Sequence, residues 1–264
     1  MTVIRRMLSY ATFKTQVAFR KLAQARAQAD LRRRESLWNV LQEYLAKTQS
    51  TGCNLTDYWA LYHEVRNRKP LEVLECGTGV STLIIAHALM ENERETGRRG
   101  RVTSMEEFDE WLDMSRRLLP TQYHPYVDFR LSETVEDRFS LFRGVRYRDV
   151  PDKRYDFVFV DGPKTASPED GTPTFDFDFL HILRTAEHPV FALIDKRVST
   201  CFVLQQVLGM EKLRYSPVLH LGFVGPCTRN DLGHLAEKLS SDNFEHSFSP
   251  IGKTHLSMQP VQDK

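Results

Sequence analysis

The 264-residue sequence predicts an α/β protein whose central sheet is doubly wound and mostly parallel, with helices on both faces. Two observations favour this fold. From residue 71 onward, short apolar runs of strand length alternate with longer amphipathic runs of helix length. In addition, the run RYDFVFVD at 154–161 is nearly all apolar, as a strand covered on both faces should be. Such strand–helix alternation is typical of a parallel sheet.

The first fifty residues are predicted to be helical, and the second part of this segment carries one apolar stripe. The stripe follows the i, i+3, i+4, i+7, i+8 spacing of a helix that packs one face against a neighbour. It consists of Leu37, Val40, Leu41, Tyr44 and Leu45. After a break at 50–52, a second helix is expected at 55–68 and ends before Pro70, because proline cannot continue a helix.

The remaining elements follow in alternation. Strands are expected at 71–75, 101–106, 126–132, 154–161 and 189–195, and helices at 81–93, 108–119, 177–186 and 201–210. Two β-like runs within 212–225 are expected to form an antiparallel hairpin. The whole pattern is Rossmann-like. We divide the chain into a basic helical extension at 1–50, a ligand-binding domain at 51–240 and a polar tail at 241–264 that is expected to be mobile.

Composition places the chain among ordinary globular proteins. It is 41% hydrophobic and 27% charged, with a formal net charge of +1, so it is not a polyelectrolyte and no nucleic-acid partner is expected. No apolar run approaches the ~18 residues of a membrane span. The four cysteines are far apart and lack the spacing of a zinc site: Cys53, Cys76, Cys201 and Cys227. Because no secretory signal is visible, we expect a reducing, cytoplasmic location.

The N-terminal segment concentrates positive charge. Residues 1–34 contain Arg5, Arg6, Lys14, Arg20, Lys21, Arg26, Arg32, Arg33 and Arg34, against the single acid Asp30. Several interpretations stay open: a solvated helix face, an amphipathic anchor on anionic lipid, a helix that binds a partner or a second copy in a homo-oligomer, or an organellar presequence.

Acidic residues end four of the predicted parallel strands. They are Glu75, Glu106 (followed by Glu107), Asp161 and Asp195. In sheets of this class, ligands bind at the carboxyl ends of the strands, near the point where the strand order reverses. These acids are therefore the main candidates for a binding site.

Two glycines follow the first of these acids. Gly77 and Gly79 allow a tight strand-to-helix turn on which a ligand can lie against the backbone. Such turns bind dinucleotides or S-adenosylmethionine. The dinucleotide pattern GxGxxG would need glycine in place of Thr82 and an acid ~20 residues later, and Glu106 comes later than that. Acids at the rim would also repel a pyrophosphate and attract a sulfonium and an ammonium, so they favour the methyl donor.

The runs VLECGTGVSTL, VTSMEEFDEW and YDFVFVDGPK resemble the class I S-adenosylmethionine-dependent methyltransferases over roughly residues 58–209. The resemblance implies that Glu106 binds the ribose hydroxyls, that Glu75 and Gly77 hold the methionine amino end, and that Glu133 lies near the adenine. The family usually carries a third glycine soon after Gly79, where Val80 and Ser81 stand here. The cofactor-binding residues implied are Glu75, Gly77, Thr78, Gly79, Ser81, Thr82, Glu106, Glu107, Glu133 and Asp161.

The segment DGPK is similar to the catechol and caffeoyl-CoA type of O-methyltransferase, in which a lysine three residues after the aspartate is the general base. This resemblance implies catalytic roles for Asp161 and Lys164, with Lys196 as a second candidate base. Those enzymes complete a divalent-metal site with an aspartate and an asparagine after the fifth strand. Asp195 matches the aspartate, but Lys196 replaces the asparagine and has no acceptor atom, so no metal is expected.

Together these features predict S-adenosylmethionine-dependent methyl transfer to a hydroxyl of a small molecule or sugar. A nicotinamide-dependent oxidoreductase and a non-catalytic scaffold with the same fold are the alternatives. The turn-rich segment 165–178 is expected to cover the acceptor pocket, and Asp176 and Asp178 are expected to cap the next helix. Cys76 and Trp111 are expected to be packing residues, with a position beside the adenine as the alternative for Trp111 because it follows the predicted ribose acid. Tyr58 and Trp59 are placed at the edge of the cofactor site.

Overall fold

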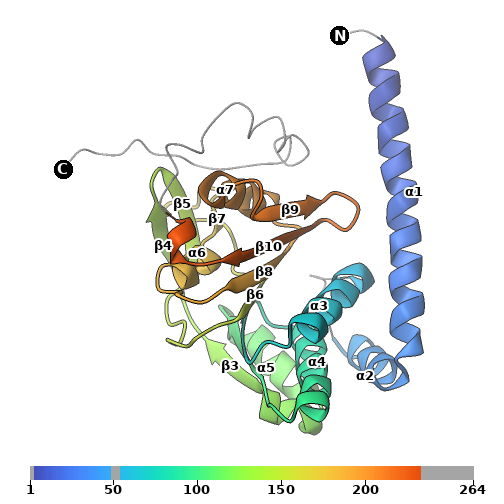
Figure 1. The fold of residues 1–264 in the computed structure, drawn as a ribbon, viewed down its shortest axis with the longest axis vertical. Helices are drawn as coiled ribbons and strands as arrows, with labels where there is room; N and C mark the ends of the chain where they lie inside the picture. Colours follow the sequence, from blue (N-terminus) through green and yellow to red (C-terminus); the bar gives the residue numbers. More distant parts are fainter. Residues whose placement is uncertain (1–2, 49–53, 233–264) are drawn as a thin grey trace, which may run out of the picture.

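The computed structural model describes residues 3–48 and 54–232, which form a seven-stranded sheet flanked by helices and a smaller three-stranded sheet (Figure 1). The large sheet contains β1 (Glu72–Cys76), β2 (Arg101–Glu106), β3 (Val127–Leu131), β6 (Phe157–Val160), β8 (Val190–Asp195), β9 (Leu213–Ser216) and β10 (Leu221–Cys227). Their order across the sheet is β3-β2-β1-β6-β8-β10-β9. The order reverses beside β1, so the carboxyl end of β1 is the place where a ligand is expected.

The strand directions match the sequence prediction. The first five strands in this order are parallel, β10 is antiparallel to β8, and β9 is antiparallel to β10. The predicted fold class, a mostly parallel sheet with a C-terminal antiparallel hairpin and N-terminal helices, is confirmed. The second sheet was not predicted. It consists of β4 (Thr134–Phe139), β5 (Phe142–Tyr147) and the short β7 (Phe175–Asp176), with β4 and β5 forming an antiparallel hairpin.

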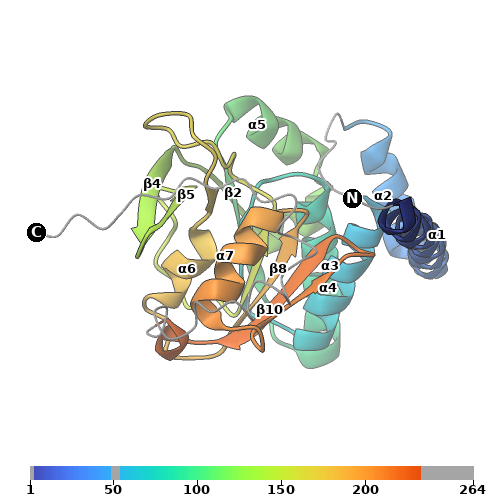
Figure 2. The same ribbon diagram turned by 90° about the horizontal axis from the view of Figure 1, so that it is seen from above.

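Helices cover both faces of the large sheet. They are α1 (Val3–Arg33), α2 (Glu35–Leu45), α3 (Leu55–Arg68), α4 (Val80–Thr96), α5 (Asp109–Leu118), α6 (Asp178–Leu183) and α7 (Val198–Leu208), with 3-10 turns at Thr121–Tyr126 and Arg229–Asp231. Figure 2 shows α3 and α4 on one side of the sheet and α6 and α7 on the other. Each face therefore has its own apolar core.

Alternation along the strands divides the apolar residues between these two cores. Val73 and Phe157 belong to the cluster beneath α3 and α4, whereas Leu74 and Val158 belong to the cluster beneath α6 and α7. All four side chains are fully buried. Side chains of a strand point alternately to opposite faces, so a strand covered on both sides must be apolar at successive positions. This requirement explains the unbroken apolar run at 157–160.

The N-terminal helices share the core of the sheet. In α2, Leu37, Leu41 and Tyr44 of the predicted stripe are buried in the same cluster as α4. In α1, Leu31 is buried, and Asp30 accepts a hydrogen bond from Trp59 Nε1 at 3.0 Å. The partner surface of the predicted stripe thus lies within this chain. The domain boundary at residue 50 stays a prediction, and the predicted tail at 241–264 lies outside the described residues.

Helix α1 extends beyond the rest of the fold at its N-terminal end (Figure 1). Its contact with the sheet includes Arg20, whose Nη2 donates to the carbonyl of Pro217 in the β9–β10 turn at 3.1 Å. Neither α1 nor any other described helix is both long enough and apolar enough to cross a membrane.

Candidate active site

The turn after β1 and the loop after β6 cross with almost no space between their backbones. Gly77 has a φ of 93°, in the left-handed region that favours glycine, and its N–H donates to Met105 O at 3.0 Å. A Cβ on Gly77 would lie 3.0 Å from Gly162 N, and a Cβ on Gly162 would lie 2.8 Å from both Gly77 Cα and Tyr147 Oη. The protein's own loop therefore makes the close backbone approach that the sequence predicts near Gly77.

Glu106, at the end of β2, is a buried carboxylate held by backbone donors. It is only 7% exposed. Its Oε1 accepts from the N–H groups of Glu107 at 2.9 Å and Phe108 at 3.2 Å, and its Oε2 accepts from Thr78 N at 3.2 Å. Burial raises the pKa of Glu106, while these three N–H groups oppose the rise by stabilising the charged form. The carboxylate is thus fixed against the first glycine turn.

A cavity of about 390 Å³ opens beside the turn after β1 and the loops after β2 and β6. It is lined by Gly77, Thr78, Glu106, Glu107, Phe108, Trp111, Tyr147, Asp161, Gly162, Pro163, Lys164 and Arg197. Six residues predicted for cofactor binding or catalysis are in this lining: Gly77, Thr78, Glu106, Glu107, Asp161 and Lys164. Trp111 also lines the cavity and is only partly buried, so of its two predicted positions the one beside a ligand is favoured.

Glu107 connects the loop after β2 to the loop after β6. Its Oε1 accepts from Lys164 N at 2.9 Å. The Lys164 ammonium lies over the Phe108 ring, 4.2 Å from the ring centroid, and the lysine side chain is exposed. A cation over an aromatic face is attracted by the ring's quadrupole, so this contact orients the lysine at the cavity rim.

Arg197 is a site residue that the sequence reasoning missed. Its Nη1 donates to Pro163 O at 2.6 Å and to Asp176 Oδ1 at 2.7 Å, and its Nη2 donates to Asp161 O. The guanidinium therefore ties the loop after β6 to the start of α7. The only sequence signal was its position just after the β8 acid, because its partners are far away in the chain.

Asp176 and Asp178 were expected to cap the next helix, but their side chains bind residues of other elements. Asp176 is fully buried and accepts from Arg197 and from Thr200 Oγ1, the latter at 2.5 Å. Burial raises its pKa to about 6, and the Arg197 charge opposes the rise. Asp178 lies in the first turn of α6, but its Oδ1 accepts from Tyr147 N at 3.1 Å. Both carboxylates hold neighbouring elements to the cavity wall.

Glu75 lies beneath the turn and does not line the cavity. It is fully buried, and its Oε2 accepts from Thr82 Oγ1 and Ser104 Oγ, both at 2.6 Å. Thr82 Oγ1 in turn accepts from Gly79 N at 3.1 Å. Burial raises the Glu75 pKa to about 7. Its Oε1 has no hydrogen-bond partner among the described residues. Through Thr82, Glu75 supports the turn from below.

Other predicted residues also lie outside the cavity lining. The Glu133 side chain is 75% exposed and pairs with Arg148. Lys196 Nζ is 3.1 Å from Asp57 Oδ2 and 3.4 Å from Asp195 Oδ2. Ser81, in the first turn of α4, is buried.

Two aromatic residues of α3 that were placed at the edge of the cofactor site do not line the cavity either. Tyr58 is buried in the core beneath α4, and Trp59 lines a separate groove beside α1.

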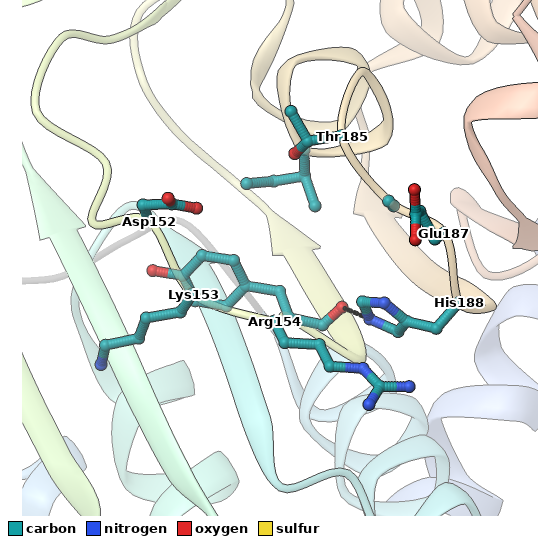
Figure 3. Close-up of a pocket in the computed structure, with 9 residues that line it drawn as sticks. Asp152, Lys153, Arg154, Thr185, Glu187 and His188 are labelled. Carbon is teal, nitrogen blue, oxygen red and sulfur yellow. Dashed lines mark hydrogen bonds between the residues drawn. The ribbon is translucent and has the colours of Figure 1, made fainter.

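A larger cavity, of about 470 Å³, lies at the opposite end of the strands, before β6 and β8 (Figure 3). It is lined by Asp152, Lys153, Arg154, Tyr155, Ile182, Thr185, Ala186, Glu187 and His188, which precede β6 and β8. His188 Nε2 contacts Tyr155 O at 2.9 Å, and Lys153 Nζ donates to Thr103 Oγ1 at 2.9 Å. This edge holds the amino ends of the strands and lacks the glycine turn, so the smaller cavity is the better candidate site.

The family comparison agrees with this choice. Residues 74–195, just under half of the chain, match the protein family described as "Methyltransferase domain". This segment is a methyltransferase domain. The family predicted from the glycine turn and the strand-end acids is thereby confirmed. The methyltransferase domain begins in β1 and ends at Asp195, so it includes the whole crossing of the two glycine-containing loops.

Solved structures similar to the chain are distant. An O-methyltransferase from Bacillus cereus in complex with SAH is 15% identical, covering 75% of this chain and 77% of that chain with a TM-score of 0.39. The O-methyltransferase TomG from Streptomyces achromogenes, in complex with SAM, is 16% identical, with coverages of 86% and 84% and a TM-score of 0.40. A putative caffeoyl-CoA O-methyltransferase from Staphylococcus aureus is 16% identical, with coverages of 82% and 88% and a TM-score of 0.46. At these scores, none of them bears on the arguments below. No curated protein matches the sequence.

The glycine crossing gives a first prediction. Gly77→Ala, at a φ of 93°, places a methyl group 3.0 Å from Gly162 N and 3.1 Å from Asp161 C, so the two loops must move apart. We expect a loss of stability of about 1–3 kcal/mol, as for other overpacked sites, measured by urea unfolding. Gly97→Ala is the control for glycine replacement alone: Gly97 also has a positive φ, of 70°, but nothing lies within 4 Å of its Cβ position. An equal loss in both variants would contradict the crowding argument.

Glu75 gives a prediction about pH. Its pKa is raised from 4.5 to about 7, so between these values the folded state keeps a proton that the unfolded state loses. The retained proton therefore stabilises the folded state. The contribution of Glu75 to the free energy of unfolding is complete below pH ~4.5 and decreases as the pH rises to ~7. Glu75→Gln removes this fall, and its stability relative to wild type should grow over that interval by on the order of 3 kcal/mol. Urea unfolding across the interval, without added ligand, measures the difference. A constant difference would contradict a raised pKa.

Proposed function

We propose that the methyltransferase domain uses S-adenosylmethionine to methylate a hydroxyl of a small molecule or sugar, with the cofactor in the cavity beside Glu106. Glu106 carries the proposal. Its carboxylate lines the cavity, and three backbone N–H groups fix its orientation. The three N–H groups take three of the roughly four acceptor sites of the carboxylate, and the remaining site on Oε2 can accept a hydrogen bond from a ribose hydroxyl.

The charges around the cavity support a cationic ligand. Glu106, Glu107 and Asp161 line it, together with the cations of Lys164 and Arg197. Asp176 lies 2.7 Å from the Arg197 guanidinium and offsets its charge. The balance at the cavity is therefore negative, which favours a sulfonium and an ammonium over a pyrophosphate. This balance is also the argument against the nicotinamide alternative.

The chain's residues act mainly by positioning. S-adenosylmethionine supplies an activated methyl group that moves by in-line displacement, and rigid placement of donor and acceptor contributes much of the acceleration. Arg197 fixes the carbonyls of Asp161 and Pro163, and so it holds the loop on which Lys164 is carried. We assign Lys164 as the general base for the acceptor hydroxyl and Asp161 as a neighbouring acceptor of hydrogen bonds. Lys196, which pairs with two buried carboxylates outside the cavity lining, is not the base in this scheme.

Calorimetry with Glu106→Gln tests cofactor binding. S-adenosylhomocysteine should bind the wild type, and NAD should not. In Glu106→Gln the dissociation constant should rise about tenfold or more, because one charge-assisted acceptor is replaced by an amide. Glu110→Gln is the matched control, since Glu110 is exposed in the first turn of α5 and does not line the cavity. Tighter binding of NAD than of S-adenosylhomocysteine would overturn the proposal in favour of an oxidoreductase.

Turnover of an acceptor tests the role of Lys164. A product-detection screen over phenols, sugars and hydroxy acids would first identify an acceptor, with and without chelator. With that acceptor, Lys164→Met should lower kcat by about 10²–10⁴-fold while S-adenosylhomocysteine still binds. Lys47→Met, on the exposed end of α2, should leave kcat unchanged. Unchanged kcat in Lys164→Met would exclude the lysine as base, and binding of S-adenosylhomocysteine with no product from any acceptor would favour the scaffold alternative.

Location and partners remain proposals as well. We propose a cytoplasmic location and no nucleic-acid partner. The same interpretations of the basic N-terminal helix stay open: a solvated face, an anchor on an anionic lipid surface, a helix that binds a partner or a second copy, and a presequence. Strong salt dependence of binding would distinguish an electrostatic partner from a solvated face.

A further inference from the structure

Next to the cavity, two buried carboxylates from distant parts of the chain share one lysine. Asp57 lies in the first turn of α3, and Asp195 ends β8. Their side chains are 0% and 1% exposed. The Lys196 ammonium is 3.1 Å from Asp57 Oδ2 and 3.4 Å from Asp195 Oδ2. The lysine therefore serves as counter-ion to both acids at once.

The electrostatics of this cluster require a cation. Both carboxylates are removed from water, and a buried charge is strongly disfavoured unless a cation or hydrogen-bond donors compensate it. The Lys196 ammonium is within ion-pair distance of both. Removing one partner of a buried ion pair is strongly destabilising, because the remaining charge is left uncompensated. Without the lysine, these two carboxyl groups would need protons or another cation.

The backbone holds the lysine in this position at a cost. Lys196 has a φ of 46°, in the left-handed region that a residue with a Cβ seldom adopts. Its N–H donates to His220 O at 2.9 Å, which ties the turn after β8 to the start of β10. Asp57 is fixed as well, because its Oδ2 accepts from Asn54 N at 2.9 Å in the capping box of α3. Both sides of the ion cluster are thus set by the main chain.

A divalent metal of the kind implied by the resemblance to catechol-type O-methyltransferases does not fit these residues. Magnesium or calcium would need oxygen ligands at about 2.0–2.6 Å. The Lys196 ammonium has no lone pair to offer and contacts the carboxylate oxygens that a metal would use.

We propose that the Lys196 ammonium is a built-in replacement for a divalent cation between Asp57 and Asp195. It shares its single positive charge between the two carboxylates and so offsets one of their two negative charges, joins α3 to the end of β8, and makes the site insensitive to metals. An asparagine at the same position would remove the cation and add a neutral oxygen ligand. Lys196→Asn should therefore open a divalent-cation site formed by Asp57, Asp195 and the new side chain. This inference concerns cation binding and stands independently of the methyl donor.

Thermal unfolding of the full chain with manganese or magnesium tests the proposal. Wild type should keep the same Tm in EDTA and in millimolar MnCl₂ or MgCl₂. Lys196→Asn should have a lower Tm in EDTA and gain about 5 °C in MnCl₂ at a concentration ~100 times its dissociation constant. Lys196→Gln is a second variant with the same neutral amide on a longer side chain, for use if the asparagine variant does not fold. Lys196→Arg keeps the cation and should gain nothing.

The matched control removes one carboxylate from the same background. The double variant Lys196→Asn with Asp57→Asn should lose the manganese response, whereas Lys164→Asn, in the loop after β6, should never acquire one. Calorimetry should give a manganese site in Lys196→Asn that is at least tenfold tighter than in wild type. A wild type that binds manganese as tightly as the variant, or folded Asn and Gln variants with no manganese response, would overturn the proposal. Neither result depends on methyl transfer, so failure of the proposed function would be seen separately.

Discussion

The need to compensate buried carboxylates determines how the loops at the carboxyl ends of the strands are held together. A carboxylate taken out of water is strongly disfavoured unless donors or a cation compensate it, and the carboxyl edge of the sheet buries several. Each is compensated differently. Glu75 accepts from two hydroxyls, Glu106 from three backbone N–H groups, Asp176 from a guanidinium and a hydroxyl, and Asp195 shares a lysine with Asp57. These four arrangements connect the turn after β1, the loops after β2 and β6, and the N-termini of α3 and α7.

The buried carboxylates fall into two groups: some line the cavity, and others only hold the loops around it. Glu106 lines the cavity, and its hydrogen-bond partners are three backbone N–H groups from the turn after β1 and the loop after β2. Glu75, two residues before Gly77, is enclosed by Thr82 and Ser104 and acts on the cavity only through the shape of the turn. Glu75 is the penultimate residue of β1, whereas Glu106 is the last residue of β2. The two acids therefore have different roles at the same end of the sheet.

The sequence predicted what depends on local pattern. The parallel strands and the cavity residue Glu106 follow from apolar periodicity and from the rule that ligands bind at strand ends. The β4–β5 hairpin was missed because its buried face contains an ion pair, Arg143 with Glu136, whose side chains are 4% and 1% exposed. A buried pair of this kind interrupts the alternation of apolar and polar residues on which strand prediction relies. Glu133, predicted to lie near the adenine, does not line the cavity: its side chain is 75% exposed and pairs with Arg148.

Contacts between distant residues could not be predicted, and they set the charges beside the cavity. Asp57 precedes the matched methyltransferase segment at 74–195, yet it supplies one of the two carboxylates around Lys196. The N-terminal helices therefore do more than cover one face of the sheet: α3 contributes a charge to the edge at which the cavity opens. Because the lysine takes its second carboxylate from outside the matched segment, the charge balance at these strand ends depends on both parts together. An exchange of the N-terminal helices alone would leave Lys196 with one carboxylate fewer, and so would change the charge beside the cavity without touching a residue that lines it.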